Sequence, residues 1–354
     1  MLKRIFLVCC VTVGLQCAAQ TAAPAAPAPL PQDPRALLEL ARPHYDFNDP
    51  AMKPWHLKAS YRLYDEKGNP SGTGTFEYWW ASPKVERSTW IRGNAAHSDW
   101  RTADGKTAYL TNGPGVDFFE TKLRSALVAP LGNSISMDPA HAILKREDVK
   151  LGSAKLPCLM VVPKMDQHGK ILELPLGLFP TYCFDPSLPV IRVENSFGTV
   201  AMQFNKIVKM QGKYLAKEID LYEGQRRLLS ADVDQVNLIQ ANDAALTPPT
   251  DAHFPSIERV STSAGVAVGM LMNKQQPIYP QDAKDARASG TVVLQAIIGR
   301  DGSVHDLSVV SGPWPSLVAA ALQAVAQWKY RPYLLNGEPV EVETTVNVIF
   351  SLGN

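Results

Sequence analysis

Residues 290–311 read GTVVLQAIIGRDGSVHDLSVVS, and this stretch decides the fold of the C-terminal part of the chain. From Thr291 to Gly299 apolar side chains recur at every second position, as they do in a strand with one buried face. Asp301-Gly302 then supplies a pair that is favoured in tight hairpins because it accepts a positive φ. A second strand is expected from Val304 to Ser311. The stretch therefore predicts an antiparallel β-hairpin.

The sequence on either side of the hairpin predicts two helices and a third strand. Pro280 stands before a short helix expected from Gln281 to Ala288, where its missing N–H costs no hydrogen bond. Ser316 is expected to cap a second helix that extends to about Trp328. The last strand is expected from Val340 to Phe350. Its inward-facing residues are expected to be Val342, Thr344, Val346, Val348 and Phe350. This order of elements is typical of a two-layer α/β domain with an antiparallel sheet.

A set of motifs at consistent spacing links this region to a known family. Pro-x-Tyr-Pro comes first, followed by Asp-Gly, Ser-Gly, Trp-x-Tyr-x-Pro and Gly-x-Pro-Val between residues 277 and 340. Together they resemble the C-terminal domain of TonB-type energy transducers. The motif residues, which we expect to be mostly structural, are Tyr279, Pro280, Gly290, Asp301, Gly302, Gly312, Trp328, Tyr330, Pro332 and Gly337.

The predicted topology places the last strand at the edge of the sheet, with unpaired backbone groups. Such an edge either needs protection or serves to add a foreign strand. The resemblance implies the second, because in this family the strand is the docking edge for a short extended segment of an outer-membrane receptor. The residues expected to bind peptide are Val340, Val342, Thr344, Thr345, Val346, Asn347 and Val348.

The N-terminal sequence indicates export from the cytoplasm. Lys3 and Arg4 precede an apolar run from Ile5 to Leu15, which is shorter than the roughly 20 residues that span a bilayer. Residues 1–19 are therefore predicted to form a cleaved signal peptide, and the Ala- and Pro-rich residues 20–34 a linker. The rest is predicted to divide into a β-rich domain at 35–246, a linker at 247–263 and the TonB-like domain at 264–354.

The middle domain is predicted to be a curved antiparallel sheet with a helix or two, at 34–41 and 117–128, which makes the fold class of the chain α+β. Its strand pattern, including Thr181 to Pro186 followed by Val190-Ile191-Arg192, resembles the LolA/LolB-like lipoprotein-carrier half-barrel. That resemblance implies an apolar cavity able to hold acyl chains or another hydrophobic ligand. Alternatively, the aromatic residues of the domain fill its own core. Either account fits Trp79, Trp80, Trp90 and Trp100.

Two cysteines, Cys158 and Cys183, remain after the predicted signal peptide. In an exported protein two thiols most simply form one disulfide, and the alternative is a pair of buried free thiols. Without matched histidines they do not suggest a zinc site.

Composition and motifs favour an interaction protein over an enzyme. The formal net charge of +1 creates no strong field that would attract nucleic acid. The seven histidines are scattered without metal-ligand spacing, and neither a Gly-x-Ser-x-Gly elbow nor a phosphate-binding glycine loop occurs. We therefore expect no catalytic residue, cofactor or metal.

These observations predict a periplasmic protein whose C-terminal domain docks on an outer-membrane TonB-dependent receptor or another envelope protein, in the service of outer-membrane transport. The alternative is a periplasmic carrier of lipid or another hydrophobic ligand, with the TonB-like domain as its docking handle. The short apolar run and short linker depart from the family pattern of an uncleaved membrane helix and a long spacer. The chain is therefore not expected to transmit force from the inner membrane by itself.

Overall fold

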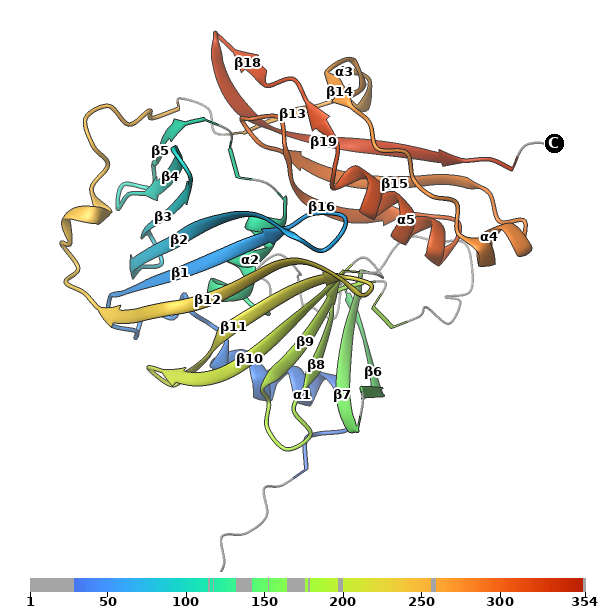
Figure 1. The fold of residues 1–354 in the computed structure, drawn as a ribbon, viewed down its shortest axis with the longest axis horizontal. Helices are drawn as coiled ribbons and strands as arrows, with labels where there is room; N and C mark the ends of the chain where they lie inside the picture. Colours follow the sequence, from blue (N-terminus) through green and yellow to red (C-terminus); the bar gives the residue numbers. More distant parts are fainter. Residues whose placement is uncertain are drawn as a thin grey trace, which may run out of the picture.

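The computed structural model describes residues 29–113, 115–116, 118–131, 142–151, 153–163, 176–177, 179–196, 200–255 and 259–352. The predicted signal peptide and most of the predicted N-terminal linker lie outside these residues. A large sheet and a smaller one contain most of the strands, and the two domains built on them lie against each other (Figure 1).

The large sheet has twelve strands in the order β5-β4-β3-β2-β1-β12-β11-β10-β9-β8-β7-β6, all antiparallel. Most strands pair with their neighbours in sequence, whereas β1 also pairs with β12 and joins the two halves of the domain. The strands are β1 (Trp55–Tyr64), β2 (Pro70–Ser82), β3 (Val85–Arg92), β4 (Ala95–Arg101), β5 (Thr107–Asn112), β6 (Ala142–Leu151), β7 (Ala154–Pro163), β8 (Thr181–Phe184), β9 (Ile191–Ser196), β10 (Val200–Met210), β11 (Lys213–Glu223) and β12 (Arg226–Leu238).

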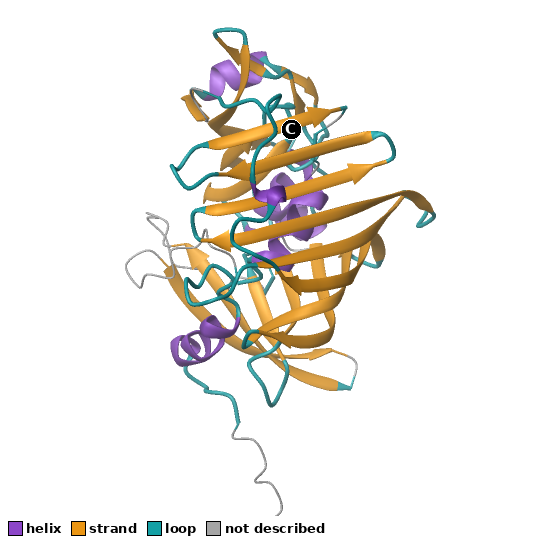
Figure 2. Ribbon diagram, turned by 90° about the vertical axis from the view of Figure 1, so that its left-hand side faces the viewer, coloured by secondary structure: helices purple, strands orange, loops and turns teal. Residues whose placement is uncertain are grey.

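The large sheet curls round helix α2 (Phe118–Val128), as Figures 1 and 2 show. Leu123 and Leu127 of this helix are buried in the same apolar core as the strands. Helix α1 (Pro34–Ala41) is capped by Asp33, whose carboxylate accepts a hydrogen bond from the backbone N–H of Ala36. Two 3₁₀ turns, η1 (Arg42–His44) and η2 (Ala244–Leu246), complete the domain. The predicted curved antiparallel sheet is confirmed.

Aromatic side chains fill the core of the β-rich domain. Trp55, Phe76 and Trp80 are at most 1% exposed, and Trp90 is also buried. Trp79 and Trp100 instead lie on the other face of the sheet, on either side of the Arg87 guanidinium, whose Cζ is 4.5 and 4.9 Å from their ring centroids. The sequence left two alternatives, an apolar ligand cavity or a core filled by aromatic side chains. The inward-facing tryptophans fit the second.

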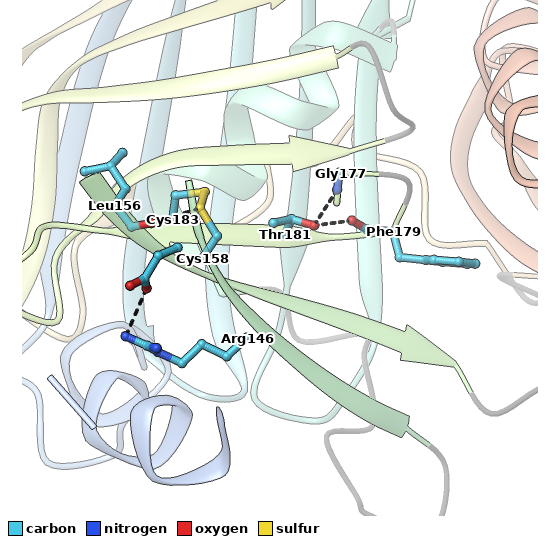
Figure 3. Close-up of a disulfide and its surroundings, with 8 residues drawn as sticks. Arg146, Leu156, Cys158, Gly177, Phe179, Thr181 and Cys183 are labelled. Carbon is cyan, nitrogen blue, oxygen red and sulfur yellow. Dashed lines mark hydrogen bonds and ion pairs between the residues drawn. A yellow bond between two sulfur atoms is a disulfide. The ribbon is translucent and has the colours of Figure 1, made fainter. Parts of the chain in front are cut away.

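Cys158 of β7 and Cys183 of β8 face each other across the two paired strands and form a disulfide (Figure 3). The predicted disulfide is therefore present, and the alternative of free thiols is wrong. Beside it, the Thr181 hydroxyl accepts a hydrogen bond from the Gly177 N–H (3.1 Å) and donates one to the Phe179 carbonyl (2.8 Å). These bonds hold the backbone next to Phe179, which lies in the domain interface described below.

The smaller sheet has the strand order β13-β19-β15-β16, with β18 paired to one end of β19 and a separate β14–β17 pair beside it. The predicted order helix, strand, strand, helix, strand is found in α4, β15, β16, α5 and β19. The elements are β13 (Arg259–Thr262), α3 (Ala264–Gly269), β14 (Leu271–Asn273), α4 (Gln281–Asp285), β15 (Gly290–Ile298), β16 (Val304–Ser311), α5 (Pro315–Val325), β17 (Lys329–Tyr330), β18 (Tyr333–Leu335) and β19 (Glu338–Phe350).

Several details of this domain differ from the prediction. Helix α5 is not capped by Ser316: Trp314 is the N-cap residue and Pro315 occupies the first turn, where its fixed φ suits a helix start. A second difference is β13, which lies inside the range predicted as the second linker and runs parallel to β19. The short elements α3, β14, β17 and β18 were not predicted either.

The two domains share buried apolar surface. Phe118 of α2, Met160 and Val162 of β7, and Phe179 belong to the same buried cluster as the core of the C-terminal domain. Helix α2 also contacts β16, the outermost strand of the smaller sheet on that side. The Arg300 guanidinium lies 4.6 Å from the ring centroid of Tyr109 across the interface. The β16 edge of the smaller sheet therefore faces the β-rich domain.

Replacing both bridging cysteines, as Cys158→Ser with Cys183→Ser, is expected to lower the free energy of unfolding of the β-rich domain by about 3 kcal/mol. The bridge joins residues 25 apart in sequence, and closing a loop of that length restricts the unfolded chain to about this extent. Denaturant unfolding measures the difference. A reducing agent should destabilise the wild type and leave the double variant unchanged; equal midpoints for wild type and variant would contradict the expectation.

Interface stability is expected to fall as the pH rises above about 6.5, the ordinary value for histidine. Burial alone would lower the pKa of His97, but the hydrogen bond to Asp99 (2.8 Å) and the charges of Asp99 and Asp301 raise it, against the opposing charge of Arg300. A raised pKa stabilises the folded state below the unfolded value, and this contribution disappears as the pH passes the folded value. His97→Gln should flatten the decline in thermal unfolding curves between pH 6 and 8.5, whereas the control His44→Gln should keep it.

Candidate functional site

Strand β19 forms the backbone of the candidate site. It pairs antiparallel with β15 over nine residues, from Val342 opposite Ile298 to Phe350 opposite Gly290. Alternate side chains enter the core, as predicted. The buried side chains of the strand are those of Val340, Val342, Thr344, Val346, Val348 and Phe350. The other residues face outward, so one side of the sheet is apolar and the other carries polar groups.

The second side of β19 is occupied only in part. On this side β13 pairs in parallel with residues 341–344. Strand β18 pairs with residues 338–340, before the stretch of β19 that pairs with β15. The prediction of an open edge from Val340 to Phe350 is therefore wrong for Val342 and Thr344, which pair with β13 on this side, whereas Val340 pairs with β18. Among the described residues, positions 345–350 pair only with β15. Thr345, Val346, Asn347 and Val348 of the predicted set lie in this open part.

Sequence reasoning missed β13 because its pattern is short. Arg259 and Ser261 are exposed while Val260 and Thr262 are half-buried, which gives a single alternation over four residues. Strand assignment needs a longer pattern, and the preceding prolines favoured a linker. The signal that could have found the strand is the combination of β-branched residues at 260 and 262 with an arginine able to pair with Glu341.

The open part of β19 is uncharged, whereas the covered part carries two satisfied acids. Glu341 pairs with Arg259 (2.9 Å), and Glu343 accepts a hydrogen bond from the Gln295 amide (2.8 Å). Beyond them, residues 345–350 read Thr-Val-Asn-Val-Ile-Phe. An incoming strand would therefore meet backbone groups and neutral side chains along this stretch.

Apolar side chains are exposed near the carboxyl end of the open edge. Ile349 is 75% exposed on the outer face of β19. Ile278 is 83% exposed and precedes Tyr279, whose ring lies 5.4 Å from that of Phe350. Large aliphatic groups at this exposure are candidates for contact with a partner.

Several motif residues stabilise the elements around this strand through hydrogen bonds and burial. Tyr279 donates a hydrogen bond from its hydroxyl to the Ala288 carbonyl, and the Trp328 indole N–H donates to the Gln275 carbonyl (2.8 Å). Tyr330 is buried, and burial raises the pKa of its hydroxyl. Asp301 accepts a hydrogen bond from the Ser303 N–H (3.0 Å) in the hairpin turn.

The remaining motif residues lie at turns and element ends. Pro280 is the N-cap residue of α4, and Pro332 separates β17 from β18. A side chain at Gly312 would collide with Val318 of α5. Gly290, Gly302 and Gly337 have positive φ, at +139°, +79° and +87°.

A polar cavity of about 320 Å³ lies between the domains, and its charged groups are largely paired with one another. Glu86 pairs with Arg101 (3.1 Å) and Arg124 (3.5 Å), and Glu341 pairs with Arg259. Within the described residues no group of three or more His, Cys, Asp or Glu side chains is placed to hold a metal ion.

Comparison with known proteins classifies the C-terminal domain. Residues 275–352 match the family model of the Gram-negative bacterial TonB protein C-terminal. Over 78 residues the chain is 31% identical to Protein TonB of Vibrio cholerae serotype O1, a match that covers 22% of this chain and 32% of that protein. These residues therefore form a TonB C-terminal domain, and the chain spans less than half the length of this curated relative.

Solved structures resemble each of the two domains. The TonB C-terminal domain of Pseudomonas aeruginosa is 27% identical and covers 24% of this chain and 86% of its own, with a TM-score of 0.21. A putative outer membrane lipoprotein-sorting protein domain from Vibrio parahaemolyticus covers 60% of this chain and 97% of its own at 10% identity, with a TM-score of 0.37. A LolA superfamily protein from Nitrosomonas europaea covers 60% of this chain and 97% of its own at 8% identity, with a TM-score of 0.33. In the part of the chain that the structure describes, no helix is long and apolar enough to cross a membrane.

Gly302→Ala is expected to destabilise the TonB domain far more than Gly337→Ala. Both glycines have a left-handed φ, which costs a side chain roughly 1–2 kcal/mol. A Cβ at Gly302 would also lie 1.9 Å from the Tyr330 carbonyl oxygen, whereas nothing lies within 4 Å of one at Gly337. We expect losses in the free energy of unfolding of about 3 kcal/mol or more and about 1 kcal/mol. Denaturant unfolding followed by amide hydrogen exchange of β15 and β19 measures both, and similar losses would contradict the close backbone contact.

Proposed function

We propose that the TonB domain binds an extended segment of another envelope protein, such as an outer-membrane TonB-dependent receptor, by strand addition along residues 345–350. The observation that carries this proposal is β13. Its four residues are already added in parallel to β19, immediately before the open part of the same edge. An edge that accepts one short strand from outside the core fold has the geometry to accept another.

The arrangement of the two domains supports the choice of edge. The β16 side of the sheet faces α2, so a foreign strand would meet the β-rich domain there. The β19 side carries no charge from Thr345 to Phe350, and a neutral edge does not repel an added strand. Main-chain hydrogen bonds would supply affinity, and Ile349 would supply a contact for an aliphatic side chain. The role is one of non-enzymatic protein interaction in the periplasm, in outer-membrane transport.

Carriage of a lipid by the β-rich domain is a weaker candidate. Its core contains Trp55, Phe76 and Trp80 at most 1% exposed, and α2 adds Leu123 and Leu127 to the same core. The packing of these described residues gives the carrier function no support.

A photo-crosslinking amino acid placed at Asn347 is expected to capture an outer-membrane TonB-dependent receptor in living cells. Asn347 is exposed in the open part of β19, within reach of an added strand. The matched control is a probe at Thr291, which is also exposed but lies on β15, opposite Ile349. Mass spectrometry identifies the captured protein.

Receptor adducts from Asn347 that greatly exceed those from Thr291 would support docking along the edge. Equal yields from both positions would contradict it. Adducts formed only between copies of this chain would instead assign the edge to self-assembly and would also contradict receptor docking.

A further inference from the structure

We propose that β13 occupies, within the same chain, part of the edge of β19 to which the partner segment binds. Full docking of the partner therefore displaces β13. The partner segment resembles β13 in its sequence pattern. The inference rests on the proposed function and deepens it by naming both the competitor and the chemistry of the partner. The partner segment would carry a cationic residue opposite Glu341, followed by a branched aliphatic residue opposite Val342.

The first contact that defines this pattern is an ion pair. Both Nε and Nη2 of Arg259 donate to the same Glu341 carboxylate oxygen, at 3.1 and 2.9 Å. The Arg259 side chain remains 43% exposed and that of Glu341 24% exposed. An ion pair in contact with water contributes direction and register more than strength, so it can select a cation without holding it permanently.

The second contact is apolar. Val260 lies opposite Val342 and packs against the buried cluster of the C-terminal domain, while Ser261 is exposed. At the end of the strand, the Thr344 hydroxyl donates to the Thr262 carbonyl (3.1 Å). In this parallel register a partner segment would place a cation opposite Glu341 and an aliphatic side chain opposite Val342. At the third position only its backbone would make contact.

The short pairing of β13 makes it replaceable. It pairs with β19 over four residues, whereas β15 pairs with the same strand over nine. Val260 is its single aliphatic side chain, and it is only half-buried. Helix α3 follows directly after Ser263 and also contacts β19. Release of β13 would lengthen the stretch of β19 without a strand partner on this side from 345–350 to 341–350.

Occupation in cis lowers the apparent affinity for a partner by the fraction of molecules in which the edge is free. If β13 is docked in nine molecules of ten, its release strengthens binding roughly 10-fold. A peptide that matches this pattern poorly therefore binds too weakly to displace β13.

The test uses the full chain and a fluorescent synthetic peptide with the chain's own sequence at residues 258–263, ERVSTS. Arg259→Glu places a carboxylate beside Glu341 and should release β13 without altering β19 or the core. Ser261→Ala is the matched control, because its side chain is exposed on the same strand. We expect the peptide to bind Arg259→Glu roughly 10-fold or more tightly than it binds the wild type or Ser261→Ala. Fluorescence anisotropy measures the three affinities.

A second peptide, in which the arginine of ERVSTS is replaced by glutamate, tests the partner pattern. It should bind Arg259→Glu markedly more weakly than the original peptide does, because Glu341 remains in place. Equal affinity of wild type and Arg259→Glu for ERVSTS would overturn displacement while leaving strand addition along 345–350 intact. Equal affinity of Arg259→Glu for the two peptides would overturn the cation requirement. If no variant bound either peptide, both the inference and an edge that accepts parallel strands would be overturned.

Discussion

The antiparallel pairing of β15 with β19 is the interaction on which the TonB domain depends. Its nine residue pairs set which side chains of each strand enter the core, because a shift of one residue would turn every one of them to the other face. Val292, Leu294 and Ala296 of β15 are therefore buried together with Val346 and Val348 of β19. With one side of β19 committed to β15, the other side pairs with β13 at residues 341–344 and, among the described residues, has no strand partner from Thr345 onward.

The β-rich domain determines which edge of the smaller sheet remains accessible. The apolar contacts of Phe118 and Phe179 with the C-terminal core bring α2 against β16, so that edge is turned inward. Arg300 and Asp301, in the turn between β15 and β16, approach Tyr109 and His97 and add polar contacts to the same interface. The β-rich domain thus covers the β16 edge of the smaller sheet. The segment between the two domains contributes β13 to the β19 edge.

Sequence patterns predicted the elements whose side chains alternate over many residues. The hairpin of β15 and β16 and the final strand were found because burial on one face imposes period two. Strand β4 was missed because His97 and Asp99 alternate with other small or polar residues and point toward the domain interface instead of a core. Strand β13 was missed because its alternation covers only four residues. The open edge was correspondingly overestimated, since the linker that covers residues 341–344 gave no long pattern of its own.

Backbone availability along β19 is the physical quantity that separates a docking strand from a structural one. Amide hydrogen exchange, resolved by residue with NMR spectroscopy, measures it directly in the full chain. The account predicts slow exchange throughout residues 342–344, where β19 has strands on both sides, and alternation of slow and fast exchange over 345–350, where amides directed away from β15 have no strand partner. Uniformly slow exchange from 341 to 350 would contradict the account, because it would show that the edge is already closed.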